Sequence, residues 1–239
     1  GSGEGRNTSL GHTDTQSWQA VQCWWKLREF WAPAGRIGVW RAGAAFVIAE
    51  ENLAPERVDY IYKDCNCKLA ITSEIWEEIS HWKPLDGYEE TDPHDAAYAV
   101  YTSGTTGTPK GVLHEYGNLE RCKESANYLG EEIFDQGERF ALAAPLNFVA
   151  STMVLSYALY RGCCTSHILS FSTVKNPIGL MKYLLFKRIT LFFLTPTYAR
   201  KFAGKTGPFL KKMVVGSEPA NGYYLKGVTN YNMYAQSEG

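Results

Sequence analysis

The chain has 239 residues, of which 45% are hydrophobic and 21% are charged, enough apolar sequence for one or two packed domains. Its 24 lysines and arginines balance 25 aspartates and glutamates, so the formal net charge is -1. This balance excludes nucleic acid as a dominant partner, and the apolar content excludes disorder over most of the chain.

The first 37 residues predict a tail followed by a helix. The opening GSGEGRNTSLGHTDTQ lacks the apolar core of a signal peptide. In residues 17–31, apolar side chains that include Trp18, Val21 and Trp25 recur at loosely helical spacing, and Pro33 and Gly35 would end the helix. We therefore expect residues 1–37 to be a tail and a tryptophan-rich helix outside the main domain.

From residue 38 onward, short apolar runs alternate with helical patterns. The runs that predict strands are Phe46–Ile48, Leu69–Thr72, Tyr98–Thr102, Phe140–Ala144, Thr190–Leu194 and Met213–Val215. Pro55–Asp64 and Pro177–Lys187 predict helices. The alternation predicts an α/β fold with a mainly parallel β-sheet flanked by helices, in which ligands bind at the carboxyl ends of the strands.

Phe140–Tyr160 is long enough to span a membrane and carries no formal charge. Pro145 and Asn147 interrupt it, so we expect a buried strand, a turn and a buried helix, with no membrane span. The six cysteines show neither disulfide-framework nor zinc spacing, which predicts reduced thiols in a cytoplasmic protein.

One segment, YTSGTTGTPKG at residues 101–111, has the groups that a polyphosphate site needs. Its glycines allow close approach of an anion, its hydroxyl side chains can donate hydrogen bonds, and Lys110 supplies positive charge. The Walker A pattern GxxxxGK[ST] does not fit, because Pro109 precedes the lysine and Gly111 follows it. The segment therefore belongs to another class of phosphate-binding loop.

This segment resembles the phosphate loop of the adenylate-forming superfamily, which includes acyl-CoA synthetases, nonribosomal peptide synthetase adenylation domains and D-alanine:carrier protein ligases. Five further segments follow the family's order, with the peptide synthetase and D-alanine ligase branch most similar. They are RAGAAFV at 41–47, PER at 55–57 with KLAITS at 68–73, GSEP at 216–219 and NMYAQSE at 232–238. The resemblance implies that residues 38–239 are part of an AMP-binding core domain.

The resemblance also implies roles for individual residues. Lys110 and Ser237 would act on the ATP phosphates, and Glu238 would be catalytic through binding of magnesium. Tyr234 would stack on adenine. The other nucleotide-binding residues would be Thr102, Ser103, Gly104, Thr105, Thr106 and Gly107 in the loop, with Gly216, Ser217 and Glu218 beside the base.

The implied reaction is attack by a substrate carboxylate on the α-phosphorus of ATP, which gives an acyl-adenylate and pyrophosphate. Charge stabilisation and in-line orientation would supply the catalysis. An acid-thiol ligase of this kind then transfers the acyl group to the phosphopantetheine of a carrier protein or to CoA.

The same alignment assigns an apolar acid pocket to Phe148, Val149, Ala150, Met153, Phe193, Met213, Val215 and Met233. Val149 stands where amino-acid-activating members have an aspartate that pairs with the substrate ammonium group. A buried ammonium group beside valine would lack its counter-charge, so an acid without an α-ammonium group is expected. The alternative is that Val149 is a core residue and the alignment is shifted by one position.

The family's catalytic unit is about twice as long as this chain, and its ribose-binding aspartate, hinge and small C-terminal domain are absent. We therefore expect the chain by itself to bind ATP but to be weakly active or inactive as an enzyme. The alternative function is a nucleotide-binding module or degenerate homologue without turnover.

His114 and Glu115 follow the loop, and we expect them to lie at the surface or behind the site, since the loop chemistry does not require them.

Overall fold

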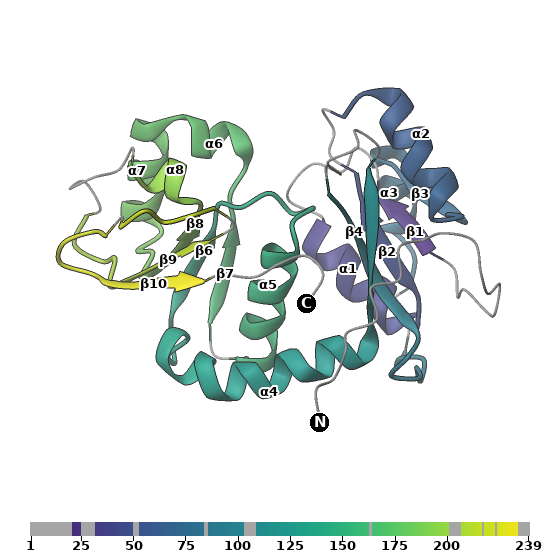
Figure 1. Cartoon of the computed structure of the whole chain (residues 1–239), viewed down its shortest axis with the longest axis horizontal. Coiled ribbons are helices and arrows are strands. Elements are labelled where there is room, and N and C mark those ends of the chain that lie inside the picture. The colour runs from purple at the N-terminus through teal and green to yellow at the C-terminus, as the bar shows by residue number, and fades with distance from the viewer. Residues whose placement is uncertain are drawn as a thin grey trace. The chain divides into compact units, whose positions relative to one another are not determined.

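The computed structural model describes residues 21–24, 32–49, 53–83, 86–102, 109–162, 164–200, 207–216, 218–222 and 224–233. The chain divides between Glu120 and Arg121 into two units, which we call unit 1 and unit 2. Each unit contains a five-stranded β-sheet with helices packed on it (Figure 1). The expected α/β fold is therefore confirmed, with two sheets where the sequence predicts one.

The described part of unit 1 begins with a strand that the sequence did not predict. Its elements are β1 (Val21–Trp24), α1 (Ala32–Arg41), β2 (Ala45–Ile48), α2 (Pro55–Asp64), β3 (Leu69–Ile71), α3 (Ser73–Ile79), β4 (Ala96–Thr102) and β5 (Lys110–Glu115). The strands have the order β3-β1-β2-β4-β5, and all neighbours are parallel except the antiparallel pair β4 and β5. Helix α4 (Tyr116–Ile133) begins in this unit.

The expected helix at residues 17–31 is wrong where the chain is described. Val21–Trp24 is a strand that pairs on both sides, with β2 and with β3. Valine and tryptophan are favoured on a pleated surface, and that pairing outweighs a weak helical pattern. Pro33 lies near the start of α1, where a missing N–H group costs nothing, so it begins a helix and does not end one.

Helices cover both faces of the unit 1 sheet. On one face, the aromatic rings of Trp40 in α1 and Phe46 in β2 lie 5.4 Å apart, and Tyr98 continues the cluster. On the other face, Ile61 of α2 and Cys65, which follows the helix, pack against the buried side chains of Val47 and Ala99. Helix α2 begins at Pro55, as its sequence pattern predicts.

Unit 2 contains the end of α4 and a sheet in which every strand is parallel to its neighbours. Its elements are β6 (Arg139–Leu142), α5 (Val149–Arg161), β7 (Thr165–Ile168), α6 (Phe171–Lys175), α7 (Pro177–Phe186), β8 (Leu191–Leu194), α8 (Pro196–Ala199), β9 (Lys212–Gly216) and β10 (Thr229–Met233). The strand order is β10-β9-β8-β6-β7. Strand β6 and helix α5 occupy the apolar segment 140–160, as expected.

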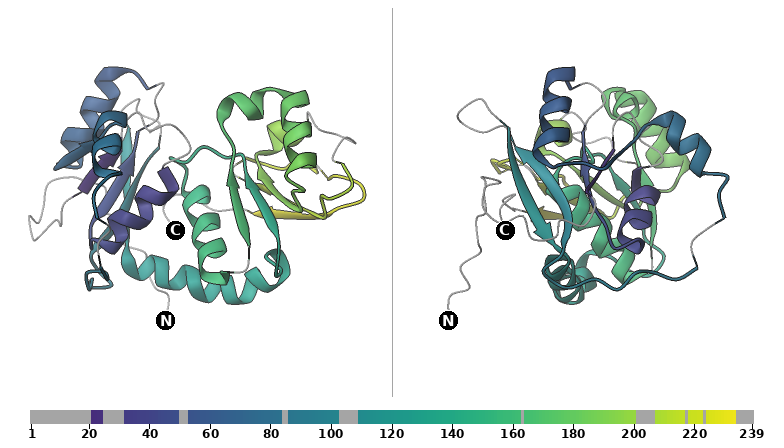
Figure 2. Two further views of the ribbon diagram at one scale, coloured as in Figure 1. Left: turned by 180° about the vertical axis from the view of Figure 1, so that it is seen from behind. Right: turned by 90° about the vertical axis from the view of Figure 1, so that its right-hand side faces the viewer.

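The unit 2 sheet separates two apolar cores. Val154 and Tyr157 of α5 pack on one face with Phe140 and Phe193. Leu180 and Leu184 of α7 pack on the other face with Phe192. Two opposite views show α5 on one side of this sheet and α6, α7 and α8 on the other (Figures 1 and 2). Since α5 connects β6 to β7 and α7 leads into β8, successive connections leave the sheet on opposite faces.

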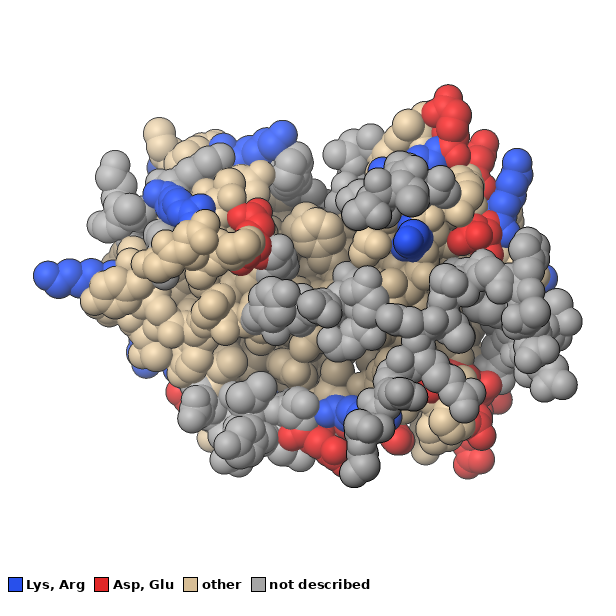
Figure 3. Space-filling model, in the orientation of Figure 1, with Lys and Arg blue, Asp and Glu red and all other residues tan. Residues whose placement is uncertain are grey.

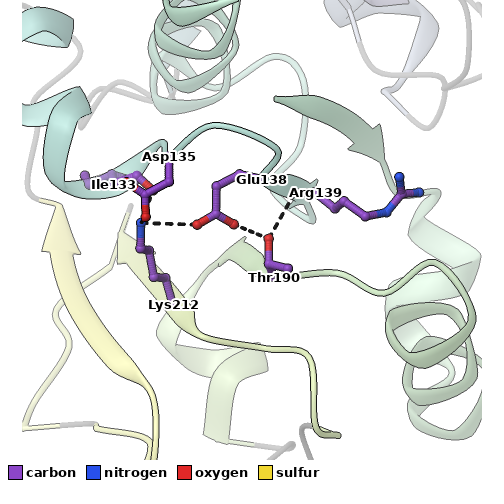
Figure 4. A network of polar contacts seen from close by, with 6 residues as sticks. All are labelled: Ile133, Asp135, Glu138, Arg139, Thr190 and Lys212. Atoms are coloured by element: carbon purple, nitrogen blue, oxygen red, sulfur yellow. Dashed lines mark hydrogen bonds and ion pairs between the residues drawn. The ribbon is translucent and has the colours of Figure 1, made fainter. Parts of the chain in front are cut away.

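A buried ion network lies at the amino ends of these strands (Figure 4). The ammonium group of Lys212 donates to Asp135 at 2.6 Å and to the carbonyl oxygen of Ile133 at 3.0 Å, and lies 3.1 Å from the Glu138 carboxylate. The Thr190 hydroxyl donates to the second Glu138 oxygen. The Glu138 side chain is only 5% exposed, so this network holds a carboxylate in the interior.

The expectation that the cysteines are reduced thiols holds for only some of them. Cys67 is disulfide-bonded, so the expectation of reduced thiols is wrong there, whereas Cys65, Cys122 and Cys164 are free. Spacing along the sequence does not show which thiols folding brings together.

Among the described residues, no helix combines the length and apolar character needed to cross a membrane.

Candidate active site

The two ends of the candidate phosphate loop are fixed by strand pairing in unit 1. Thr102 ends β4 and Lys110 begins β5, and the two residues are register partners in the antiparallel pair. The Lys110 side chain is exposed, and Thr102 is partly buried. The chain therefore leaves and re-enters the sheet at one point, as a hairpin loop does.

Several site residues from the sequence analysis lie outside the described residues, so their positions remain predictions. They are Ser103, Gly104, Thr105, Thr106, Gly107, Ser217, Tyr234, Ser237 and Glu238.

Tyr101, one residue before Thr102, attaches the end of β4 to α2. Its hydroxyl donates to the Asp64 carboxylate at 2.5 Å and lies 3.1 Å from the Cys65 sulfur. Burial raises the pKa of Cys65 to about 11, and burial likewise raises the pKa of Tyr101. Both groups are therefore neutral at pH 7 and act as hydrogen-bonding groups that fix the strand beside the loop.

Replacing Tyr101 with phenylalanine should lower the free energy of unfolding by about 1–3 kcal/mol, since the partly buried Asp64 carboxylate loses its donor. Urea denaturation measures this loss. Tyr60→Phe, on the exposed side of α2, is the matched control and should change stability by less than about 0.5 kcal/mol. Equal stability of the two variants would contradict the assigned role of the Tyr101 hydroxyl.

Unit 2 has a topological switch point between β6 and β8. These strands are neighbours, and the connections that follow β6 and precede β8 lie on opposite faces of the sheet. In open parallel sheets, ligands bind outside the carboxyl ends of the strands at such a point. The topology of the sheet, without reference to any sequence motif, therefore predicts that the residues after Leu142 and Leu194 form a binding region.

Most of the expected pocket residues in unit 2 lie near this edge or on the α5 face. Phe148 precedes α5 and is exposed, while Val149 and Ala150 begin the helix and are buried. Met153 and Met233 pack against the same core cluster as Ala150 and Phe193. These residues are therefore brought together on one side of the sheet.

The structure does not bring Met213 and Val215 into that group. Both residues are buried on the opposite face, in the cluster that contains Leu180 of α7. Side chains alternate along a strand, so the β9 residue that faces α5 is Val214, the register partner of Phe193. Met213 and Val215 therefore lie on the other side of the sheet from Phe193, and their assignment to the acid pocket stays a prediction.

Gly216 and Glu218 lie where β9 ends. A Cβ atom on Gly216 would meet the carbonyl oxygen of Met233 at 2.7 Å, so β10 approaches too closely for any side chain. The Glu218 carboxylate accepts hydrogen bonds from the backbone N–H of Thr197 at 3.1 Å and from its hydroxyl at 2.5 Å. Glu218 thereby connects the exit of β9 to the first turn of α8.

The Gly216→Ala substitution should lower the free energy of unfolding by about 1–3 kcal/mol, because the added carbon meets backbone that cannot rotate away. Thermal or urea denaturation measures the change. Gly38→Ala, in the exposed part of α1 with open space around the new carbon, should be neutral or stabilising. If both alanines had the same effect, close packing at Gly216 would not be the cause.

Two polar residues at the switch point were missed by the sequence analysis. The side-chain oxygens of Asn147, after β6, and Thr195, after β8, are buried and make no hydrogen bond to the described residues. An unsatisfied buried oxygen costs about 1–3 kcal/mol, so both are suited to a polar ligand group. Their positions just after apolar strand runs were the available sequence signal, but burial depends on the tertiary fold.

The sequence left two positions open for His114, at the surface or behind the site. The structure shows that its side chain is buried. It is 6% exposed and its ring stacks on Tyr98, with the ring centroids 4.4 Å apart. The antiparallel register of β4 and β5 places these residues opposite each other. Glu115 is nearer the surface, with its carboxylate 3.2 Å from His94.

In the described part of the chain, no group of histidine, cysteine and acidic residues has the arrangement of a metal site.

The sequence profile of a family described as AMP-binding enzyme matches residues 77–239. This match covers more than half of the chain, which therefore belongs to the AMP-binding enzyme family.

Individual proteins support the same membership. Surfactin synthase subunit 1 of Bacillus subtilis is 32% identical over 202 residues, which are 76% of this chain and 6% of that protein. Nonribosomal peptide synthetase apmB of Penicillium brevicompactum is 26% identical over 231 residues, which are 88% of this chain and 10% of that protein. The chain thus spans a tenth or less of the length of these relatives, and its resemblance to peptide synthetases is confirmed.

A solved structure supports the fold. The N-terminal subdomain of NpsA from Klebsiella oxytoca, in complex with 3-hydroxyanthranilyl-AMSN, has a TM-score of 0.72 and 17% sequence identity. The match covers 92% of this chain and 60% of that one. The architecture is therefore that of the N-terminal region of an adenylate-forming enzyme.

Proposed function

We propose that the chain is part of an enzyme that activates a carboxylic acid with ATP. A carboxylate oxygen attacks the α-phosphorus, the bond to the bridging oxygen breaks, and pyrophosphate leaves with that oxygen. The observation that carries the proposal is the loop TSGTTGTPK, whose ends Thr102 and Lys110 are paired in the sheet. Such a loop offers backbone and hydroxyl donors and a cation to a polyphosphate.

The nucleotide site would combine residues from several segments. Ser103, Thr105, Thr106 and Lys110 would hold the phosphates, and Tyr234 would stack on the adenine with Gly216, Ser217 and Glu218 beside it. The contacts of Glu218 with Thr197 support a role in shaping this turn.

Glu238 would hold magnesium, which supplies positive charge to the phosphates when bound, and Ser237 would donate to them. A carboxylate and a hydroxyl are donors that suit magnesium and phosphate, respectively.

The acid would bind at the carboxyl edge of the unit 2 sheet. Val149 is buried and begins α5, where an aspartate would be needed to pair with a substrate ammonium group. Phe148, Ala150, Met153, Phe193 and Met233 would supply apolar contacts. Asn147 and Thr195 would hydrogen-bond a polar substituent, because their oxygens are buried without partners among the described residues. We propose an aryl, aliphatic, keto or hydroxy acid.

Membership of the AMP-binding enzyme family supports four wider proposals. The acyl group would pass to the phosphopantetheine of a carrier protein or to CoA. Residues 38–239 would form part of the AMP-binding core, and the enzyme would be cytoplasmic. The chain alone would bind ATP with little turnover.

Binding and turnover test these proposals separately. Calorimetry should detect ATP binding by the 239-residue chain, while pyrophosphate exchange with a panel of acids should be weak. Strong exchange would contradict the expected inactivity of the chain alone, and absence of ATP binding would contradict the nucleotide site.

The acid class can be tested with two acyl-sulfamoyl adenosines, one made from an aryl acid and one from an α-amino acid. The wild-type chain should prefer the aryl compound, and Val149→Asp should shift the preference toward the amino-acid compound by about tenfold, the effect of one partly buried ion pair. Preference of the wild type for the α-amino compound would overturn the assignment.

A nucleotide-binding module without turnover is the second candidate, and the exposed Lys110 is compatible with it. Pyrophosphate exchange distinguishes the two: exchange activity in any longer form of the protein supports the enzyme, and ATP binding without exchange supports the module.

A further inference from the structure

Helix α7 is apolar on two opposite sides. Leu180 and Leu184 face the sheet and are almost completely buried. Ile178, Leu185 and Phe186, at positions i, i+7 and i+8 of one helical face, are 71%, 45% and 79% exposed. We call this second side the outer face of α7.

An ordinary surface helix has one apolar side, which packs on the core, and one polar side. The outer face of α7 departs from this pattern over about two turns, and large exposed apolar side chains gathered in one place mark interaction surfaces. Phe209 lies nearby in space, with the guanidinium carbon of Arg188 5.7 Å from its ring centroid. The outer face therefore has the composition of a contact surface.

The stretch of sequence that contains the outer face carries charge of one sign. Between Arg139 and Lys212 the sequence contains eleven lysines and arginines and no aspartate or glutamate, although the whole chain has a formal net charge of -1. The eleven cations are Arg139, Arg161, Lys175, Lys182, Lys187, Arg188, Arg200, Lys201, Lys205, Lys211 and Lys212. The region around α6, α7 and α8 in Figure 3 shows separate blue side chains and a red acidic group among broad tan areas.

Four exposed cations belong to the outer face or its ends. Lys182 lies within it, one helical turn after Ile178. Lys175 ends α6 just before α7, and Lys187 and Arg188 follow its last residue. Arg188 adopts a left-handed backbone conformation with φ of 49°, which favours glycine. The chain thus keeps a cation where a glycine would be less strained.

We propose that the outer face of α7 docks an acidic amphipathic helix of a protein partner. Apolar side chains of the partner would cover Ile178 and Phe186, and its carboxylates would pair with Lys182 and Arg188. Lys182 lies among the apolar side chains of the face, where it can pair with a carboxylate of the partner helix. Cations interleaved with exposed apolar side chains therefore match a partner helix that has apolar residues on one side and acidic residues beside them.

The experiment measures binding of a fluorescent synthetic helix, with leucines on one side and glutamates on the other, to the full 239-residue chain by anisotropy. The wild-type chain should bind this peptide, with affinity falling as salt rises. Phe186→Ser and Lys182→Glu should each weaken binding tenfold or more. Arg188→Gly should weaken it while leaving the melting temperature equal or higher, since glycine relieves the backbone.

Leu159→Ser on α5 and Lys63→Glu on α2 are matched controls, and neither should change the affinity. A peptide with lysines in place of the glutamates should not bind. The proposal is overturned if the wild-type chain does not bind the acidic peptide or if the outer-face variants bind as well as the controls do. Binding to phosphatidylserine vesicles that depends on Phe186, without peptide binding, would assign the face to a membrane and equally overturn it.

Discussion

Replacing Lys212 with methionine is expected to lower the free energy of unfolding of unit 2 by about 3–5 kcal/mol, the loss found when one partner of a buried ion pair is removed. Lys212 is the cation beside Glu138, whose side chain is 5% exposed. Without it, the carboxylate keeps the Thr190 hydroxyl as its donor but has lost the neighbouring positive charge. Urea denaturation followed by fluorescence measures the difference.

Two further variants show whether the buried charge is the cause. Lys211→Met changes the exposed neighbouring lysine and should alter stability by less than about 0.5 kcal/mol. The double variant Lys212→Met with Glu138→Gln should be more stable than Lys212→Met alone, since no uncompensated charge remains. A double variant less stable than the single one would show that packing, and not charge, dominates at this position.

The same network predicts a dependence of stability on pH. Burial by itself lowers the pKa of Lys212, but hydrogen bonds to Asp135 and Glu138 outweigh burial, and the pKa lies above its ordinary value of 10.5. A raised folded-state pKa contributes stability that is complete below pH 10.5 and disappears as the pH rises through the folded-state pKa. Wild type should therefore lose stability in that alkaline range, and Lys212→Met should lack this loss.

Replacing Lys110 with glutamine is expected to raise the dissociation constant for ATP about 10- to 100-fold. A hydrogen bond to a charged group is worth about 1.5–3 kcal/mol, which corresponds to that change in affinity. Because the Lys110 side chain is exposed at the start of β5, its loss should leave the free energy of unfolding nearly unchanged. Calorimetric titration with ATP measures the effect.

Lys68→Gln is the matched control, an exposed lysine of the same unit that precedes β3. It should bind ATP as wild type does. Lys110→Arg should retain part of the affinity, since the charge remains. Unchanged ATP affinity in Lys110→Gln would exclude this lysine from the phosphate site, even if the chain binds ATP.

The sequence predicted the helices and strands whose own residues show a clear hydrophobic pattern or a starting proline. Pro55 and the apolar spacing of α2 gave both of its ends, and the β-branched and aromatic runs gave β6, β8 and β9. Strand β10 has the sequence TNYNM, and its pairing with β9 depends on a close approach at Gly216 that no local pattern contains. In unit 2 the sequence therefore predicted the central strands β6, β8 and β9 but not the edge strands β7 and β10.

The residues of the candidate site also fall into two groups, those recognisable from the sequence and those that only the fold identifies. The loop at residues 101–111 was recognisable because its chemistry is continuous in sequence. Asn147 and Thr195 were not recognisable, since their unsatisfied oxygens result from packing between distant segments. The two-residue period of a strand separates Val214 from Met213 and Val215, but the position of α5 decides which of the two sides faces the expected pocket.

Strand β1 has a consequence for any shortened version of the chain. It lies between β2 and β3, and β3 pairs with no other strand among those described. A protein that began at residue 38, where the family resemblance starts, would leave β3 without a partner and the parallel edge of β2 open. Open edges of this kind recruit strands from other molecules, so such a protein would tend to aggregate. Strand β1 precedes the region of family resemblance in the sequence, yet it is an interior strand of the unit 1 sheet.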